Sequence, residues 1–306
     1  MHWSRAMSAL SGLIVAAATP FEKNGTAVDS KLYLEHCQRL LALGANGLVL
    51  SGTAGEATSL SVGTRLEVMS IAQASLPLSQ AIVGTGAAAI SDAIELTRAA
   101  ADLGFSGSLV LPSFYYKAQA EDDLFFYFER LLRGVDRPNF PLYLYHIPQL
   151  TGLSFTPEFI ERLRAAFPGV FVGLKDSEGN LEKTRQRAAA LPDVSVFAAT
   201  EEALGHVKSG ELAGVISASM NVTMRFVAQA RDTGSTEKLG AATEIRMALT
   251  SHPLIVASIK WALADLTGRP EWAQSLPPIK PLSDTLAVKL KSLLAETDYE
   301  KLRADF

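Results

Sequence analysis

Short apolar runs alternate with longer amphipathic stretches along most of the chain, and this alternation restricts the fold more than any other feature of the sequence. Most runs are near-continuous Val, Ile, Leu and Ala, which is typical of strands buried on both faces of a parallel sheet. The stretches between them have helical spacing. The expected strands are Gly12–Ala18, Gly47–Ser51, Ala81–Thr85, Ser108–Pro112, Pro141–His146, Val170–Lys175, Val194–Ala199 and Gly214–Ala218.

Helix start and stop signals support this division. A helix is expected over 29–43, where Asp29 or Ser30 is placed to cap the first turn and Gly44 to end the last. A second is expected over 91–103, with Gly104 at its end. Eight strands, each followed by a helix at intervals of roughly 25–35 residues, fit a closed (β/α)8 TIM barrel.

The C-terminal part of the chain reads as further helices punctuated by prolines. With 306 residues, the chain is long enough to bury one large core. The sequence therefore predicts a (β/α)8 barrel over residues 1–223. Residues 224–306 are expected to form the last barrel helix and a C-terminal helical extension, within the same structural unit.

A doubly wound dinucleotide-binding sheet is the rival architecture, because residues 84–89 read G-T-G-A-A-A after an expected strand. A dinucleotide site also needs an acidic residue about 20 positions further on, at the end of the next strand. Asp102 has the spacing but falls inside the expected helix. The motif is therefore interpreted as a tight strand-to-helix turn in which glycine allows close packing.

Composition excludes several functional classes. No apolar run approaches the ~18 residues of a membrane span, the longest near the start being Leu13–Ala18, so no membrane association is expected. Residues 1–5 lack the layout of a signal peptide. Cys37 is the single cysteine, which favours a reducing, cytoplasmic compartment. Basic residues are scattered, which argues against nucleic-acid binding.

Histidine spacing indicates no metal site. The five histidines fit no ligand motif such as H-E-x-x-H, so no metal is expected; they are His2, His36, His146, His206 and His252. His146 ends an expected strand and is placed beside a barrel-end pocket rather than in its chemistry.

The clearest chemical signal is Lys175, which closes the apolar run that starts at Val170. Lysine is costly to bury, and desolvation favours a neutral amine that can attack a ketone to form an imine. An exposed strand-end lysine paired with Asp176 or another carboxylate is the alternative, and Asp176 itself is expected to be a structural or surface partner. Tyr145 ends the neighbouring strand, so it could exchange protons with the amine or pack as a barrel-end aromatic residue.

Other strand ends carry polar or aromatic residues whose roles stay open. The run Thr53-Ala54-Gly55 is suited to present backbone N–H groups to a carboxylate, with Glu56 anchoring the loop. Tyr115 and Tyr116 follow the fourth strand and could pack against a helix or another subunit.

The end of the seventh strand, which reads Ala199-Thr200-Glu201-Glu202, brings two carboxylates to the barrel mouth. There they could bind substrate hydroxyls or cap the following helix.

With these residues collected, the chain resembles the dihydrodipicolinate synthase / N-acetylneuraminate lyase family from about Gly12 to beyond Asn221. The resemblance rests on G-T-A-G-E at 52–56, Y-H-I-P at 145–148, G-L-K-D-S at 173–177 and G-V-I-S at 214–217, in this order. Such enzymes are (β/α)8 barrels, usually homotetramers, that bind pyruvate or another 2-oxo acid as an imine. No separate cofactor is implied, because the substrate becomes covalently attached to the protein.

By this resemblance Lys175 is the imine lysine and Tyr145 the proton shuttle. Thr53 would couple to Tyr145, and Tyr116 would complete the relay from an adjacent subunit. The substrate carboxylate would lie on the Thr53-Ala54 loop, with the Ile216 carbonyl beside the imine.

Two departures narrow the expected reaction. Ala54 replaces a hydroxyl residue of the family's loop, so one carboxylate hydrogen bond is missing. Leu150 occupies the position at which authentic dihydrodipicolinate synthases have an arginine that binds the carboxylate of aspartate semialdehyde. Leucine cannot replace the bidentate hydrogen bonds of an arginine. The acidic run that begins at Ala199, with Glu201 and Glu202, matches residues that lyases of this family use on substrate hydroxyls.

The sequence therefore predicts a class I aldolase or lyase that releases pyruvate from a 2-keto-3-deoxy sugar acid or a sialic-acid-like compound. The alternatives are 4-hydroxy-tetrahydrodipicolinate synthesis, a dehydratase using the same imine, and a non-catalytic 2-oxo acid binding protein on the same fold.

Overall fold

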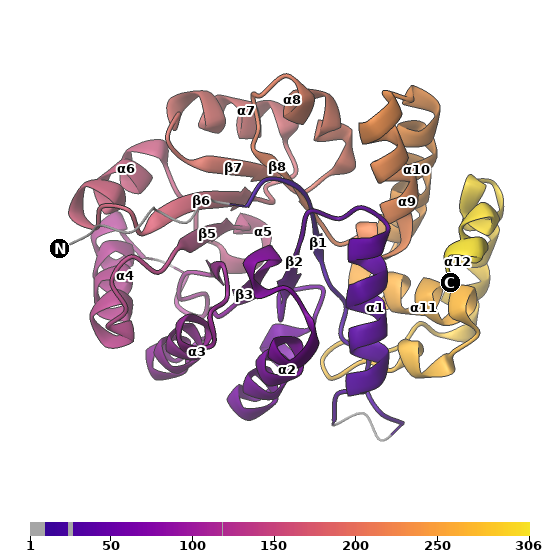
Figure 1. Ribbon diagram of the computed structural model, residues 1–306, viewed down its shortest axis with the longest axis horizontal. Coiled ribbons are helices and arrows are strands. Elements are labelled where there is room, and N and C mark those ends of the chain that lie inside the picture. The colour runs from indigo at the N-terminus through magenta and orange to yellow at the C-terminus, as the bar shows by residue number, and fades with distance from the viewer. Residues whose placement is uncertain (1–9, 24–26, 118) are drawn as a thin grey trace. The chain divides into compact units, whose positions relative to one another are not determined.

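A computed structural model describes residues 10–23, 27–117 and 119–306. Within these residues eight parallel strands follow one another in a closed barrel, in the order β1 to β8, which confirms the expected TIM barrel (Figure 1). Each strand lies within two residues of its expected bounds. The strands are β1 (Gly12–Ala16), β2 (Gly47–Leu50), β3 (Ala81–Gly84), β4 (Gly107–Val110), β5 (Leu142–His146), β6 (Phe171–Asp176), β7 (Ser195–Ala198) and β8 (Gly214–Ser217).

The chain forms two compact units, and each is described by itself. Unit 1 comprises residues 1–12 and 77–216, with β3 to β8 apart from the last residue of β8. Residues 1–5 and His2, considered in the sequence analysis, lie outside the described residues. The helices of unit 1 are α3 (Ile90–Leu103), α4 (Glu121–Val135), α5 (Pro148–Thr151), α6 (Pro157–Ala166), α7 (Leu181–Ala190) and α8 (Leu204–Lys208), with the 3-10 helices η2 (Leu78–Gln80) and η3 (Glu201–Ala203).

Unit 2 comprises residues 13–76 and 217–306. It contains β2 and all of β1 except Gly12. Its later helices confirm the expected C-terminal helical extension. The helices of unit 2 are α1 (Ser30–Ala42), α2 (Val62–Ser75), α9 (Met220–Thr233), α10 (Thr236–Thr250), α11 (Ile255–Thr267) and α12 (Asp284–Ala295), with the 3-10 helices η1 (Ala57–Ser59), η4 (Pro270–Ala273) and η5 (Asp298–Asp305).

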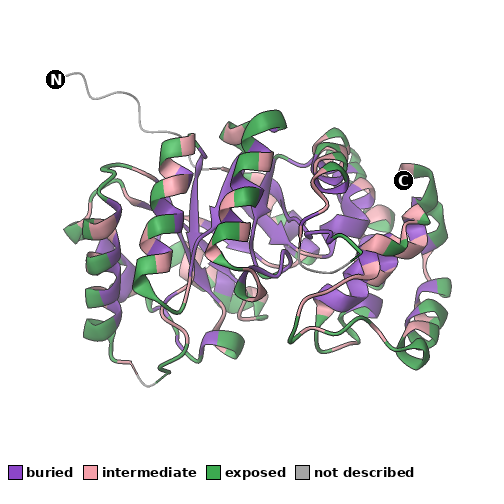
Figure 2. Ribbon diagram, turned by 90° about the horizontal axis from the view of Figure 1, so that it is seen from below, coloured by how far each residue is buried: buried purple, intermediate pink, exposed green. Residues whose placement is uncertain are grey.

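Burial follows the pattern that the sequence predicts. The strands are almost wholly buried, whereas most helices are buried along one side and exposed along the other (Figure 2). In α4, Leu124, Phe128 and Leu131 are buried, while Arg130 and Arg133 on the opposite face are exposed. This division is the one expected for amphipathic helices that cover a strand layer.

Two of the expected turn and cap signals act as predicted. The Asp29 side chain accepts a hydrogen bond from the N–H of Leu32 at 2.9 Å and so caps α1. In the turn after β3, a β-carbon on Gly86 would lie 2.6 Å from the backbone nitrogen of Leu111, so the glycine serves close packing. Asp102 forms a surface ion pair with Arg137 at 2.6 Å instead of ending a strand.

The register of β5 and β6 determines which side chains lie next to each other at the ends of these two strands. Tyr145 pairs with Lys175, and His146 pairs with Asp176. A register irregularity at Leu142 and Tyr143 precedes these pairs. Opposite it, Gly173 leaves room for the Tyr143 ring, which a β-carbon at position 173 would overlap, and the Tyr143 hydroxyl accepts a hydrogen bond from Leu10 at 2.8 Å.

In the described part of the chain, no single helix is long and apolar enough to cross a membrane. Helices α10 and α11 meet the length and composition of a span only when taken together, and they are bent by 116° at their junction.

Unit 2 has a buried polar junction that the sequence analysis did not anticipate. Asn221 of α9 donates to the carbonyls of Ala16 and Ala218, and its side-chain oxygen accepts from the N–H of Ala18. The same oxygen accepts from Nε2 of His36, which lies in α1, at 2.8 Å. Because Nδ1 of His36 faces Arg39 at 3.1 Å, the ring is held in its neutral form, and burial lowers the pKa of His36 to about 3.

This junction predicts a dependence of stability on pH. The unfolded chain takes up a proton on His36 near pH 6.5, whereas the folded chain resists it down to about pH 3. The contribution is therefore complete above about pH 6.5 and is lost as the pH falls toward 3. We expect this histidine to give a slope of about 1.4 kcal/mol per pH unit in that window.

His36→Gln, whose amide can still donate to Asn221, should flatten that slope in the free energy of unfolding, measured in denaturant between pH 4 and pH 7. The half-buried His252 offers a matched control as His252→Gln, which should leave the slope in place. Equal slopes in wild type and His36→Gln would contradict the assignment.

Candidate active site

Lys175 and Tyr145 lie side by side in unit 1. Lys175 is the next-to-last residue of β6 and Tyr145 the next-to-last residue of β5, and the two are register partners. Lys175 is 5% exposed and Tyr145 4% exposed. The lysine Nζ lies 4.3 Å from the centroid of the tyrosine ring. A buried amine therefore lies against a buried phenol, whereas the alternative interpretation required an exposed lysine.

This pair has the groups that imine chemistry needs. A primary amine is the nucleophile for a ketone, and a phenol within reach can give and take protons as the carbinolamine and imine form. Both come from rigid strands rather than loops, so their relative position is fixed by the sheet.

The carboxylates after β7 have different environments. Ala199 is half-buried, and Glu201, the first residue of η3, is fully buried, whereas Glu202 is exposed. Thr200, the N-cap residue of η3, makes no side-chain cap hydrogen bond. Ile216 is fully buried in β8. The two glutamates are therefore not equivalent, and Glu201 is the one held inside the protein.

Three other side chains of unit 1 face outward. Tyr115 and Tyr116 are 73% and 74% exposed, with their rings edge to face and the centroids 5.2 Å apart. Leu150, in α5, is 57% exposed. Within one chain, then, neither tyrosine is packed as a core residue, and Leu150 contributes an apolar surface at the position where the resemblance expects a charge.

The Thr53-Ala54 loop belongs to unit 2. Thr53 is exposed and Ala54 buried. The N–H groups of Gly55, Glu56 and Ala57 donate to carbonyls inside the loop, whereas the N–H of Ala54 has no backbone acceptor in the part of the chain that the structure describes. The loop is therefore a compact turn of the kind that can offer backbone N–H groups to an anion.

Behind the lysine, Asp176 points to the outer side of β6 because side chains alternate along a strand. It is buried and accepts three hydrogen bonds: from the N–H of Glu178 at 3.0 Å, from Thr184 at 3.0 Å and from Arg187 at 2.7 Å. The expectation of a structural partner is confirmed, although Asp176 is not on the surface. It fixes the end of the strand that carries Lys175.

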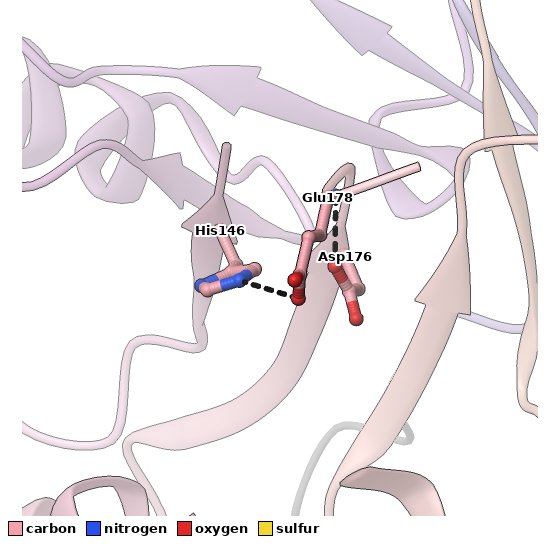
Figure 3. Close-up of side chains that lie close together, drawn as sticks. All are labelled: His146, Asp176 and Glu178. Carbon is pink, nitrogen blue, oxygen red and sulfur yellow. Dashed lines mark hydrogen bonds and ion pairs between the residues drawn. The ribbon is translucent and has the colours of Figure 1, made fainter. Parts of the chain in front are cut away.

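His146 lies on the outer side of β5 in the same way, close to Glu178 (Figure 3). Its Nδ1 accepts a hydrogen bond from the N–H of Phe155 at 3.2 Å, and its Nε2 lies 3.6 Å from a Glu178 oxygen. Burial lowers the pKa of His146. The ring is therefore neutral with its proton on Nε2, directed toward the carboxylate.

Ligand atoms of His146, Asp176 and Glu178 lie within 4.8 Å of one another, a grouping that sequence spacing did not reveal. A metal there would need the Nε2 lone pair, but Nδ1 already accepts a hydrogen bond and Nε2 carries the proton. Both carboxylates are also bound by Arg187, at 2.7 and 2.5 Å. A hydrogen bond from Lys183 lowers the pKa of Glu178 to about 2. The donor set therefore fits an ion-pair cluster better than a metal centre.

Comparison with known proteins places these features in a family. The model of the dihydrodipicolinate synthetase family matches residues 9–297. An uncharacterized DapA-like lyase of Chloroflexus aurantiacus is 31% identical over 301 residues, covering 96% of this chain and 97% of its own. A 4-hydroxy-tetrahydrodipicolinate synthase of Thermosynechococcus vestitus is 31% identical over 304 residues, covering 94% and 97%.

Among solved structures, dihydrodipicolinate synthase from Agrobacterium tumefaciens is similar, with a TM-score of 0.85 and 26% sequence identity. The match covers 94% of this chain and 99% of that one. Sequence and fold therefore agree over nearly the full length of both proteins.

The ion-pair cluster predicts unequal costs for its members. Asp176→Asn removes the buried charge that faces Arg187 and should lower the free energy of unfolding by about 3 kcal/mol. Lys183→Gln removes a lysine that is 54% exposed, and it should cost less than about 1 kcal/mol. Denaturant unfolding followed by fluorescence measures both, and equal costs would argue against Asp176 as the centre of the cluster.

Proposed function

The chain belongs to the dihydrodipicolinate synthetase family and is an enzyme of the aldolase and lyase class, and on this premise we propose that it cleaves, or reversibly forms, a C–C bond in a hydroxylated 2-oxo acid with pyruvate as the product. The observation that carries the proposal is the buried Lys175 amine, 4.3 Å from the centroid of the Tyr145 ring. In this reaction the substrate is bound covalently to the lysine, and no separate cofactor is required.

The reaction follows from the two groups. The Lys175 amine attacks the C2 carbonyl, and Tyr145 gives its proton to the carbinolamine hydroxyl, which leaves as water to give an iminium and a tyrosinate. Tyr145 takes the proton of the C4 hydroxyl as the C3–C4 bond breaks, the aldehyde leaves, and the bonding electrons enter an enamine. Protonation at C3 and hydrolysis by water then release pyruvate and regenerate the amine.

The rest of the pyruvate half has its own binding groups. The Thr53-Ala54 loop binds the carboxylate through backbone N–H groups and the Thr53 hydroxyl, and Ala54 offers no second hydroxyl. The Ile216 carbonyl flanks the imine. Thr53 also takes part in proton transfer, as the family resemblance implies.

The other half of the substrate is a hydroxylated chain, as in 2-keto-3-deoxy sugar acids or sialic-acid-like compounds. Support comes from Leu150, an exposed apolar residue that cannot grip a second carboxylate as an arginine does. Glu201 and Glu202, at the end of the run from Ala199, supply acceptors for hydroxyl groups. Dehydration of such an acid through the same imine is a close variant.

Synthesis of 4-hydroxy-tetrahydrodipicolinate from pyruvate and aspartate semialdehyde is the second candidate, favoured by the name of the Thermosynechococcus relative. The two reactions are opposite in their effect on pyruvate, since one releases it and the other consumes it.

A second subunit completes the site in this proposal. Tyr116 is 74% exposed beside an equally exposed Tyr115, which suits a side chain that reaches into the site of a neighbouring copy. A homotetramer built from two such dimers is the assembly proposed for the enzyme.

Imine formation predicts a covalent adduct. Incubation with pyruvate and borohydride should increase the protein mass by one reduced pyruvate unit, and peptide mapping should locate it at Lys175. Lys175→Met should abolish the adduct, whereas Lys183→Met, a change in α7, should retain it. Folded wild-type protein that stays unmodified at saturating pyruvate would exclude the proposed chemistry.

Proton transfer by Tyr145 predicts a difference between two tyrosines of β5. With a panel of 2-keto-3-deoxy acids, wild-type protein should release pyruvate in a coupled assay, and Tyr145→Phe should lower kcat by about 10²–10⁴-fold. Tyr143→Phe is the matched control, because the Tyr143 hydroxyl bonds Leu10 and not the substrate; kcat should hardly change. Pyruvate consumed only with aspartate semialdehyde would favour the second candidate.

A further inference from the structure

The loop from Gly52 to Ala57 has a tightly defined backbone. Its N–H groups at Gly55, Glu56 and Ala57 donate to the carbonyls of Gly52 and Thr53 at 3.0 to 3.2 Å. Glu56 is in the left-handed region with a φ of 60°, which a residue with a side chain adopts only when its surroundings impose it. Something outside the loop must therefore hold Glu56 in place.

The Glu56 side chain shows what holds it. One carboxylate oxygen lies 2.5 Å from Nζ of Lys260 in α11, and the other accepts a hydrogen bond from the N–H of Leu276 at 2.8 Å. Both charged side chains are 0% exposed, and Nζ of Lys260 lies 4.1 Å from the centroid of the Phe21 ring. Two separate segments of unit 2, α11 and the segment after η4, thus fix one residue of the loop.

The neighbouring residue is fixed as well. The Gly55 carbonyl accepts a hydrogen bond from the Thr19 hydroxyl at 3.1 Å. A β-carbon on Gly55 would lie 3.1 Å from both that hydroxyl and the Ala17 carbonyl. The backbone at 55 and 56 cannot move without breaking these contacts, and it leads directly into the Thr53-Ala54 segment.

Stability alone does not account for a buried ion pair in this place. A well-packed apolar pair is often at least as stable as a buried salt bridge, because both charges lose their hydration. Burial lowers the pKa of Lys260 to about 8 in spite of the Glu56 charge, so desolvation outweighs the attraction between the two groups. What the pair supplies is a directed constraint on the conformation of the loop.

We propose that Lys260 and Glu56 are positioning residues, which hold the Thr53-Ala54-Gly55 backbone in the conformation that binds the substrate carboxylate. The proposal rests on the proposed function, in which this loop receives that carboxylate. By this proposal Lys260 affects the affinity for substrate, although Lys260 does not contact the substrate.

The test uses Lys260→Met, which leaves the Glu56 carboxylate buried without its cation, and the double variant E56Q/K260M, in which both groups are neutral. In the double variant the new amide oxygen can still accept from the N–H of Leu276, and the methionine fills the space beside Phe21. Lys183→Met, a change in α7 of unit 1, is the control for losing a lysine. Two readouts apply: the pyruvate concentration for half-maximal borohydride trapping, and amide hydrogen exchange of the 52–57 segment.

Lys260→Met should raise the half-saturating pyruvate concentration about tenfold or more, with the maximal extent of trapping unchanged, and should speed exchange in the 52–57 segment. The double variant, which has no unpaired buried charge but also no ion pair, should change both readouts in the same direction, and its unchanged maximal trapping would exclude a general loss of folding. Unchanged half-saturation in Lys260→Met, with or without faster exchange, would overturn the proposal.

Failure of the proposed function is separable from failure of this inference. If wild-type protein traps pyruvate and Lys260→Met behaves identically, only the inference falls; if wild-type protein traps none, both fall. Should Lys260→Met not fold, Glu56→Gln takes its place, and a half-saturation equal to wild type would again overturn the proposal.

Discussion

The parallel pairing of β5 with β6 is the constraint on which the candidate active site depends. Once Tyr145 is opposite Lys175, the next residues, His146 and Asp176, are opposite each other, and they lie on the other face because side chains alternate along both strands. One face of the pair then carries the amine and the phenol, and the other carries the ion-pair cluster. The chemistry and the structure that fixes it are therefore consequences of a single register.

Buried charge recurs in both units at the places where a strand gives way to a loop. In unit 1, Arg187 binds Asp176 and Glu178 behind the lysine strand. In unit 2, Lys260 binds Glu56 behind the loop after β2. Each arrangement is directional and tolerates little displacement, which suits the segments that we propose to hold catalytic and substrate-binding groups.

The fold was accessible from sequence because its signals are local. Apolar runs, the Asp29 cap and the glycine stops define elements one at a time, and parallel strands joined by helices leave few topologies. The placement of Lys175 and Tyr145 could be predicted for the same reason, since each lies near the end of its strand. By contrast, the partnership of Lys260 with Glu56, and that of His36 with Asn221, joins residues about 200 positions apart. No spacing rule predicts such pairs, and a lysine inside an apolar helix is interpreted as a surface residue when its partner is not known.

The difference in exposure between Glu201 and Glu202 could not be predicted from sequence either, because it depends on the local backbone path of η3.

The fit between Gly173 and the Tyr143 ring restricts the order in which this sequence can change. Any side chain at position 173 would overlap that ring, so a substitution there is tolerated only after position 143 has become smaller. A smaller residue at 143 in turn gives up the hydroxyl that bonds Leu10. The two positions are therefore expected to diverge together in descendants of this chain, with the tyrosine replaced first, and a library that randomises position 173 alone would return glycine.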